Sequence, residues 1–145
     1  MTTPRRAPNL IDSFNYAFEG IIHVLRTQRN MRIHFMIAAA VLIAALILDV
    51  SKMELIALLI SITFVLIAEM LNTAIEGSID VATTSFDPNA KLAKDVAAGS
   101  VLIATVNAIA VGYLVFAGKA ADKSTTILDK IRDAPAELTI IVLVL

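Results

Sequence analysis

The sequence predicts an all-α membrane protein with an N-terminal amphipathic surface helix and three transmembrane helices. Of its 145 residues, 58% are hydrophobic and 17% are charged, which is a composition typical of membrane proteins. Three stretches carry one charge or none, at residues 33–48, 55–75 and 96–118. A helix of roughly 20 apolar residues crosses about 30 Å of hydrocarbon, so each stretch is interpreted as one span.

Residues 1–8 are predicted to be a disordered basic lead, with two arginines among prolines and threonines. From Asn9 onward, apolar residues recur at steps of three and four, while polar residues fill the other faces. These apolar positions are Leu10, Phe14, Ala17, Phe18, Ile21, Ile22 and Leu25. The pattern predicts an amphipathic helix lying at the membrane surface. The stretch is no signal peptide, because charges interrupt every apolar run.

The spans follow in order, separated by polar segments. Residues 49–54 are predicted to form a tight polar turn after span one, whose alanines favour close helix contact. Span two begins near Leu55, and its periodicity predicts one helix that continues through Asp80. Pro88 disfavours a helical residue before it, so residues 85–89 are predicted to be a loop before the helix of span three.

Lysine and arginine near the spans predict the orientation. Five arginines precede span one, Lys91 and Lys94 lie between spans two and three, and the short turn after span one has only Lys52. Such residues are retained on the cytoplasmic side, so the N-terminus and residues 76–95 are predicted to be cytoplasmic. Residues 119–145 are interpreted as a polar linker and a short apolar tail, which is either an interfacial or disordered end or the start of a further segment in a longer parent protein.

One face of the second predicted helix is polar. It carries Glu69, Asn72, Thr73, Glu76 and Asp80, at offsets of three or four residues. A carboxylate on an apolar helix is costly, which favours a functional role for Glu69. The alternative is a structural ion pair between Glu69 and Lys94 or an arginine. Asp80 is interpreted as a solvated residue at a helix end, and His34 as an interface histidine.

The polar groups of all three spans are predicted to meet at the cytoplasmic interface. Carboxylates with room for water suit Mg²⁺ bound together with substrate phosphates, and lysine suits a phosphate. A carboxylate beside a hydroxyl can accept its proton, and phosphoryl transfer depends mainly on such positioning. There is no glycine-rich phosphate loop, no cysteine and no basic excess, since the formal net charge is −1. The lack of a basic excess argues against a nucleic-acid partner, and the lack of cysteine excludes thiolate chemistry. Without a glycine-rich loop, a nucleotide site would have to be built differently.

Four stretches resemble the small prokaryotic integral-membrane lipid kinases, which comprise diacylglycerol kinase and undecaprenol kinase. They are residues 13–20 (SFNYAFEG), 29–34 (RNMRIH), 68–76 (AEMLNTAIE) and 93–99 (AKDVAAG). They occur in the family's order and define a kinase domain over residues 9–118. The stretch at 29–34 is more similar to the undecaprenol kinase branch, although diacylglycerol remains open as the substrate.

The resemblance implies an ATP- and Mg²⁺-dependent kinase that phosphorylates a membrane lipid alcohol. It also implies a homotrimer in the cytoplasmic membrane of bacterial type, with its sites between subunits. Glu69 would be the general base, and Glu76 would bind the metal that bridges the ATP phosphates. The nucleotide contacts implied are Tyr16, Asn72, Glu76, Ser85, Phe86, Asp87, Lys94 and Asp95.

Gln28 departs from the family pattern, because a second metal-binding glutamate is usual at this position. A glutamine oxygen can ligate Mg²⁺, but it lacks the charge that holds a hard cation. This departure keeps an alternative open, a non-catalytic or degenerate kinase-like subunit of a larger fusion protein. A small ion transporter using Glu69 is a weaker alternative, because Lys94 and Asp95 would have no function in it.

Overall fold

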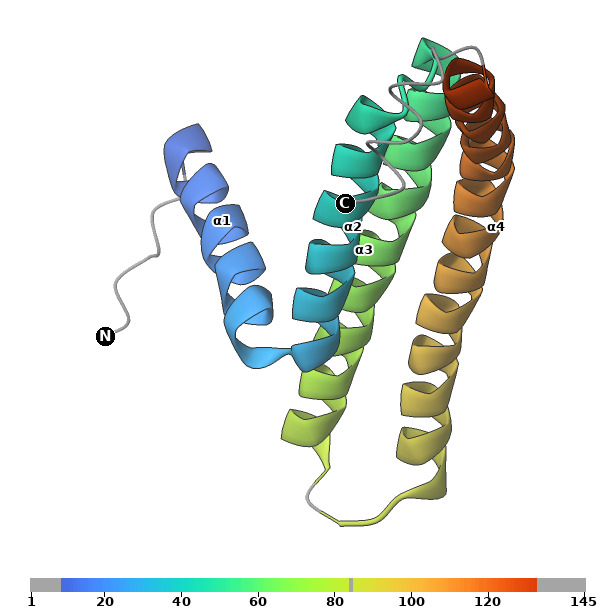
Figure 1. Cartoon of the computed structure of the whole chain (residues 1–145). Coiled ribbons are helices and arrows are strands. Elements are labelled where there is room, and N and C mark those ends of the chain that lie inside the picture. The colour runs from blue at the N-terminus through green and yellow to red at the C-terminus, as the bar shows by residue number, and fades with distance from the viewer. Residues whose placement is uncertain (1–8, 84, 133–145) are drawn as a thin grey trace, which may run out of the picture.

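The structure is a computed structural model that describes residues 9–83 and 85–132, with side chains through Lys119. This part of the chain forms four helices and no strand (Figure 1). The helices are α1 (Leu10–Thr27), α2 (Arg29–Ile47), α3 (Lys52–Ala82) and α4 (Pro88–Arg132). The predicted all-α class is therefore confirmed. The basic lead at 1–8 and the apolar tail at 138–145 lie outside the described residues.

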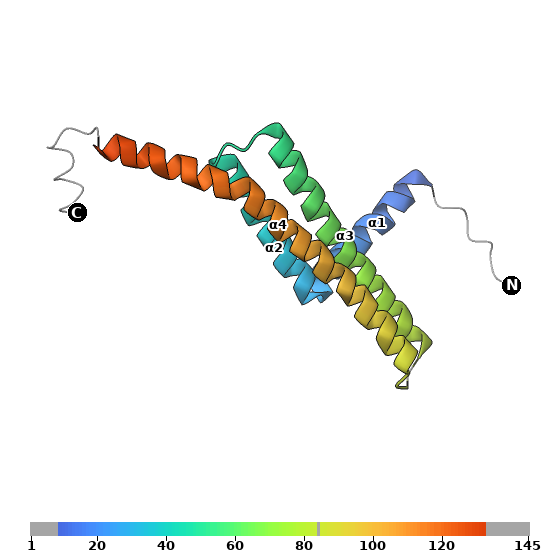
Figure 2. The same ribbon diagram turned by 90° about the vertical axis from the view of Figure 1, so that its right-hand side faces the viewer.

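Three of these helices are long and apolar enough to cross a membrane, as the sequence predicted. They are α2, α3 and the part of α4 up to Lys119. A short turn reverses the chain between α2 and α3, and α4 returns alongside α3 (Figures 1 and 2). The central helix α3 therefore packs against both of the other spans.

Capping side chains place two helix starts away from their predicted positions. Ser51 and Glu54 form a capping box, in which the Glu54 N–H donates to Ser51 Oγ at 3.3 Å and the Ser51 N–H donates to the Glu54 carboxylate at 2.6 Å. This exchange satisfies backbone donors at the helix end, so α3 starts at Lys52 within the predicted turn. Asp87 accepts from the Asn89 N–H at 2.7 Å, and α4 starts at Pro88, inside the predicted loop. Proline fits a first helical position because the N–H it lacks would be unpaired there.

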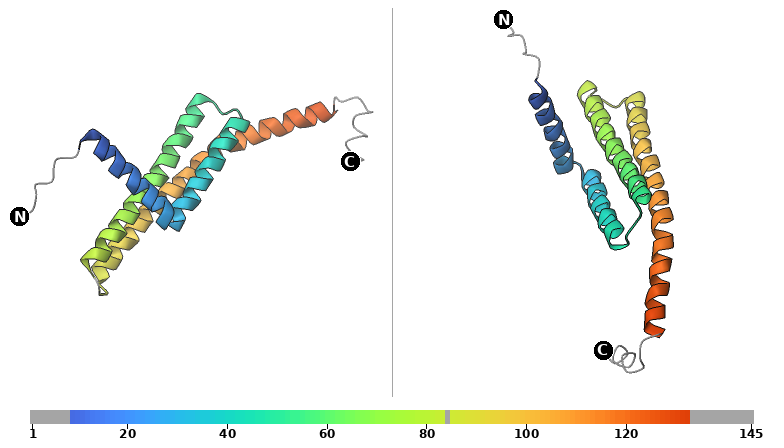
Figure 3. Two further views of the ribbon diagram at one scale, coloured as in Figure 1. Left: turned by 90° about the vertical axis from the view of Figure 1, so that its left-hand side faces the viewer. Right: turned by 90° about the horizontal axis from the view of Figure 1, so that it is seen from above.

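The first helix extends away from the other three. It begins at a capping box between Asn9 and Asp12 and meets α2 at Gln28, where the chain changes direction (Figure 3). Several large apolar side chains of α1 are exposed, including Leu10, Phe14 and Phe18. The predicted position of α1 at the membrane surface stays a prediction, and these exposed side chains are compatible with it.

The packed core lies at the end of the bundle where α2 turns into α3. Ala45, Leu58 and Val115 are buried there, one from each spanning helix. Lys119 adds an ion pair to Glu54 at 3.5 Å, and its amino group donates to the Asp49 carbonyl. These contacts hold α4 against the α2–α3 turn. The helix then continues to Arg132, so the first part of the predicted linker is helical.

Candidate functional site

Glu69 is a buried carboxylate on a membrane-spanning helix. It lies on α3 and is 2% exposed, and it is the only buried acid in the part of the chain with described side chains. His34 of α2 faces it, with Nε2 3.2 Å from Glu69 Oε1. This distance is within ion-pair range, yet Oε1 has no hydrogen-bond partner of good geometry. The interpretation of His34 as an interface histidine missed this pair.

The alternative of a structural ion pair between Glu69 and Lys94 is not what the structure shows. Lys94 of α4 forms an ion pair with Asp80 near the end of α3, and Lys91 pairs with Asp95 one turn further along α4. Lys91, Asp95 and Asp80 are exposed and Lys94 is half-buried, and ion pairs at the surface contribute about 0–1 kcal/mol. The pairs therefore lie at the solvated end of α3 and α4, and Asp80 is exposed as predicted.

Hydrogen bonds connect the polar face of α3. The Asn72 side-chain amide donates to Glu76 Oε1 at 3.0 Å, and the Thr73 hydroxyl donates to the Glu69 carbonyl at 2.9 Å. Both bonds join residues four apart, as the helical spacing predicts. Asn72 thus lies between the two acids in sequence but donates to only one of them.

A pocket of about 350 Å³ opens between α2, α3 and α4 beside Glu69. It is lined by Asn30, His34, Glu69, Asn72, Ala98, Val101, Leu102 and Thr105. Three of its side chains carry a buried polar atom without a hydrogen-bond partner, namely Glu69 Oε1, Asn72 Oδ1 and Thr105 Oγ1. An unpaired buried polar group costs about 1–3 kcal/mol, so these atoms mark the pocket as a place where a polar ligand would bind.

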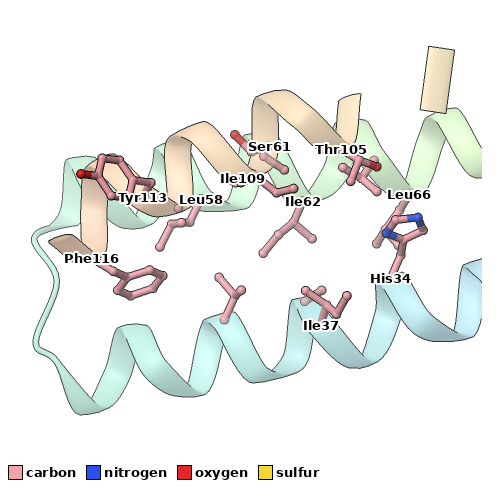
Figure 4. A pocket seen from close by; sticks show the side chains of 15 residues that line it. His34, Ile37, Leu58, Ser61, Ile62, Leu66, Thr105, Ile109, Tyr113 and Phe116 are labelled. Atoms are coloured by element: carbon pink, nitrogen blue, oxygen red, sulfur yellow. The ribbon is translucent and has the colours of Figure 1, made fainter. Parts of the chain in front are cut away.

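An apolar groove of about 250 Å³ adjoins this pocket along the same three helices. His34 and Thr105 line both hollows, and they stand together at one end of the groove (Figure 4). Tyr113 and Phe116 lie toward the other end, near the packed core. The site therefore combines a polar hollow with an apolar groove that leads away from it.

The remaining predicted site residues do not line either hollow. Tyr16 is 64% exposed on α1, and Gln28 lies at the α1–α2 junction without capping either helix by its side chain. Ser85 and Phe86 are exposed on the loop before α4, and Asp87 caps that helix. A single chain thus brings together Glu69, Asn72 and Glu76, and leaves the other predicted contacts on surrounding surfaces.

The residues present fit a metal only in part. Among the described residues, no group of three or more histidine and acidic side chains could hold a cation. Mg²⁺ commonly binds through one or two carboxylates, with phosphates and water completing its shell. Glu76, half-buried and oriented by Asn72, fits the role of a single carboxylate in such a shared site.

Asn30, His34 and Thr105 line the pocket but were not predicted as site residues. Asn30 and His34 lie four residues apart within the stretch at 29–34, so their common helix face was a usable signal. Thr105 gave no comparable signal, because a lone threonine in a span is an ordinary interhelical residue.

Comparison with known proteins agrees with the resemblance in the sequence. The sequence profile of the family described as prokaryotic diacylglycerol kinase matches residues 15–116. The chain is 43% identical over 107 residues to a diacylglycerol kinase of Synechocystis sp., an alignment that covers 73% of this chain and 61% of that protein. It is 39% identical over 107 residues to the undecaprenol kinase of Bacillus subtilis, covering 74% of this chain and 87% of that protein.

The chain therefore spans about three fifths of the length of the Synechocystis relative and most of the Bacillus one. The two relatives carry the names of the two activities in the predicted family. The profile match covers more than half of the chain and includes Glu69, Asn72, Glu76, Lys94 and Asp95. The chain belongs to the prokaryotic diacylglycerol kinase family.

Proposed function

We propose that the chain is a membrane lipid kinase that transfers the γ-phosphate of ATP to the hydroxyl of undecaprenol or diacylglycerol. The observation that carries this proposal is Glu69, a buried carboxylate with an unpaired oxygen in the wall of a polar pocket. The family membership supports the same reaction, because both similar proteins are named as lipid kinases.

Glu69 acts as the general base. Its carboxylate accepts the proton of the lipid hydroxyl while the hydroxyl oxygen attacks the γ-phosphorus, and ADP leaves. Among the described residues no side chain makes a hydrogen bond of good geometry to Oε1, which leaves this oxygen able to accept that proton. A positioned base of this kind contributes about 10²–10⁴-fold to the rate.

Glu76 and Gln28 would hold Mg²⁺ together with the phosphates of ATP. A bound ion would supply positive charge that neutralises the phosphates. The Asn72 amide fixes one Glu76 oxygen at 3.0 Å and so orients the carboxylate. Asn72 Oδ1 has no hydrogen-bond partner among the described residues, and Asn72 lines the polar pocket, so this oxygen could accept a hydrogen bond from a ligand there.

Lys94 and Asp95 provide the nucleotide contacts from α4, with Tyr16 and residues 85–87. The ion pair of Lys94 with Asp80 is exposed, so a phosphate can replace Asp80 at small cost. These groups do not converge within one chain, which supports a homotrimer with sites completed between subunits. The exposed apolar side chains of α1 supply surface for such contacts.

The apolar groove suits the hydrocarbon of the acceptor. A lipid alcohol presents a hydroxyl at one end and an apolar tail beyond it, and the two hollows that share His34 and Thr105 offer this sequence of environments. A soluble acceptor would have no use for the groove. The acceptor is therefore a membrane lipid.

The test is transfer of labelled γ-phosphate from ATP to undecaprenol and to diacylglycerol in mixed micelles. We expect transfer to at least one lipid, greater for undecaprenol, and loss of transfer when a chelator removes Mg²⁺. Folded protein that transfers phosphate to neither lipid would refute the kinase proposal. Thermal unfolding in the same detergent establishes that the protein is folded.

A further inference from the structure

We infer that His34 is a positioning residue for Glu69, whose imidazole orients the carboxylate toward the acceptor hydroxyl. This inference rests on the proposed function, in which Glu69 is the base. It adds a residue of α2 to the immediate surroundings of the proposed base on α3.

The geometry that supports the inference is a close pair of side chains from two helices. His34 Nε2 lies 3.2 Å from Glu69 Oε1, and the side chains are 18% and 3% exposed. Catalytic hydrogen bonds are often loose without substrate and tighten when it binds.

No other described side chain serves Glu69 in this way. Asn72 donates its amide to Glu76, and the Thr73 hydroxyl donates to the Glu69 backbone rather than to its carboxylate. Among the described residues, His34 is the only basic side chain within ion-pair distance of the Glu69 carboxylate. A buried carboxylate needs a hydrogen-bond donor or an opposite charge, and His34 is the group that can supply one.

The position of His34 also relates the base to the acceptor. Its side chain lines both the polar pocket and the apolar groove, so it stands where the hydroxyl of a lipid would meet its tail. An imidazole held there fixes the carboxylate on one side and bounds the acceptor on the other. Loss of the imidazole would leave the carboxylate free to turn within the pocket.

The experiment compares three variants with the wild type in the phosphate-transfer assay. His34→Leu removes the donor, and His34→Gln keeps an amide nitrogen that reaches about as far as Nε2. His23→Leu is the matched control, because His23 is the other histidine, is exposed on α1 and lines neither hollow. Both kcat and the KM values for ATP and lipid are measured.

We expect His34→Leu to lower kcat by about 10²-fold, the cost of a misplaced catalytic group, with little change in the KM for ATP. His34→Gln should recover kcat to within about tenfold of the wild type, since its amide restores the donor. His23→Leu should match the wild type. In a Glu69→Ala background, His34→Leu should cause no further loss, because the group it positions is gone.

Wild-type kcat in folded His34→Leu would overturn the inference, as would equal loss in the Gln and Leu variants. If His34→Leu does not fold, the comparison uses His34→Asn, whose shorter amide does not reach Glu69; equal kcat for Asn and Gln would then overturn it. The proposed function fails separately, when the wild type itself transfers no phosphate.

Discussion

Glu69 and Glu76 lie on one helix about two turns apart, and their surroundings differ. Glu69 is buried beside an imidazole, while Glu76 is half-buried and accepts a hydrogen bond from Asn72. A buried carboxylate with an unpaired oxygen suits proton transfer, and a partly solvated one suits a hydrated cation. The two environments are compatible with the proposed roles of Glu69 as the base and Glu76 as a metal ligand.

Gln28 is the residue at which a single change tests the proposed metal site. We expect Gln28→Glu to lower the Mg²⁺ concentration for half-maximal activity by about tenfold, equivalent to about 1.4 kcal/mol, because a second carboxylate adds charge at the cation. Titration of activity with Mg²⁺ measures this.

Ser13→Asp is the control for Gln28→Glu, since it adds the same charge on α1 away from the junction. It should leave the titration unchanged. An unchanged titration for Gln28→Glu as well would place residue 28 outside the metal shell.

At the scale of the helix, local sequence signals determine where elements begin. The Ser51 and Asp87 caps explain why α3 and α4 start earlier than hydropathy alone predicted. Both signals are visible in the sequence, as S-x-x-E and as aspartate before proline. Hydropathy identifies the apolar part of a helix, whereas a capping residue identifies the position at which the helix starts.

Asp87 has a structural task that competes with its predicted nucleotide contact. We expect Asp87→Ala to reduce stability by about 1 kcal/mol through loss of the cap, and Asp87→Asn to retain it. Thermal unfolding in detergent measures the stability of both variants. If the Asp87 carboxylate also contacts ATP, the KM for ATP will rise in both Asp87→Ala and Asp87→Asn. A rise in Asp87→Ala alone would assign the residue to capping only.

The residues that share the polar face of α3 were predictable from the sequence. The side chains of other helices that this face contacts were not. Spacing placed Glu69, Asn72 and Glu76 together on α3, and the structure agrees. Spacing cannot fix the rotation of α2 about its axis or its level beside α3. The pairing of Glu69 with His34, rather than Lys94, depends on those two quantities.

At the scale of the whole molecule, the three spanning helices pack tightly at one end and leave the polar pocket between them toward the other. Ala45, Leu58 and Val115 pack near the α2–α3 turn, and the pocket beside Glu69 lies toward the opposite end of the spans. A fixed end and an open polar end suit a site that receives ATP from one side. The orientation predicted from lysines and arginines makes that side the cytoplasm.

Single cysteines test this orientation directly, because the sequence contains none of its own. We expect Ser85→Cys, on the exposed loop before α4, to react with a membrane-impermeant maleimide only when the cytoplasmic face is accessible. Met53→Cys, exposed at the start of α3, should react only from the opposite face. Labelling of sealed vesicles of each orientation measures both, and the reverse pattern would invert the topology.

The role of Glu69 as the base of a lipid phosphotransferase is the central proposal for this protein. The direct measurement is the kcat of Glu69→Ala for transfer of γ-phosphate from ATP to undecaprenol and diacylglycerol. Glu54→Ala serves as the control, because it removes the same side chain from the other end of α3. We expect kcat to fall by about 10²–10⁴-fold in Glu69→Ala and to equal the wild-type kcat in Glu54→Ala. Equal transfer by wild type and folded Glu69→Ala would contradict the proposal.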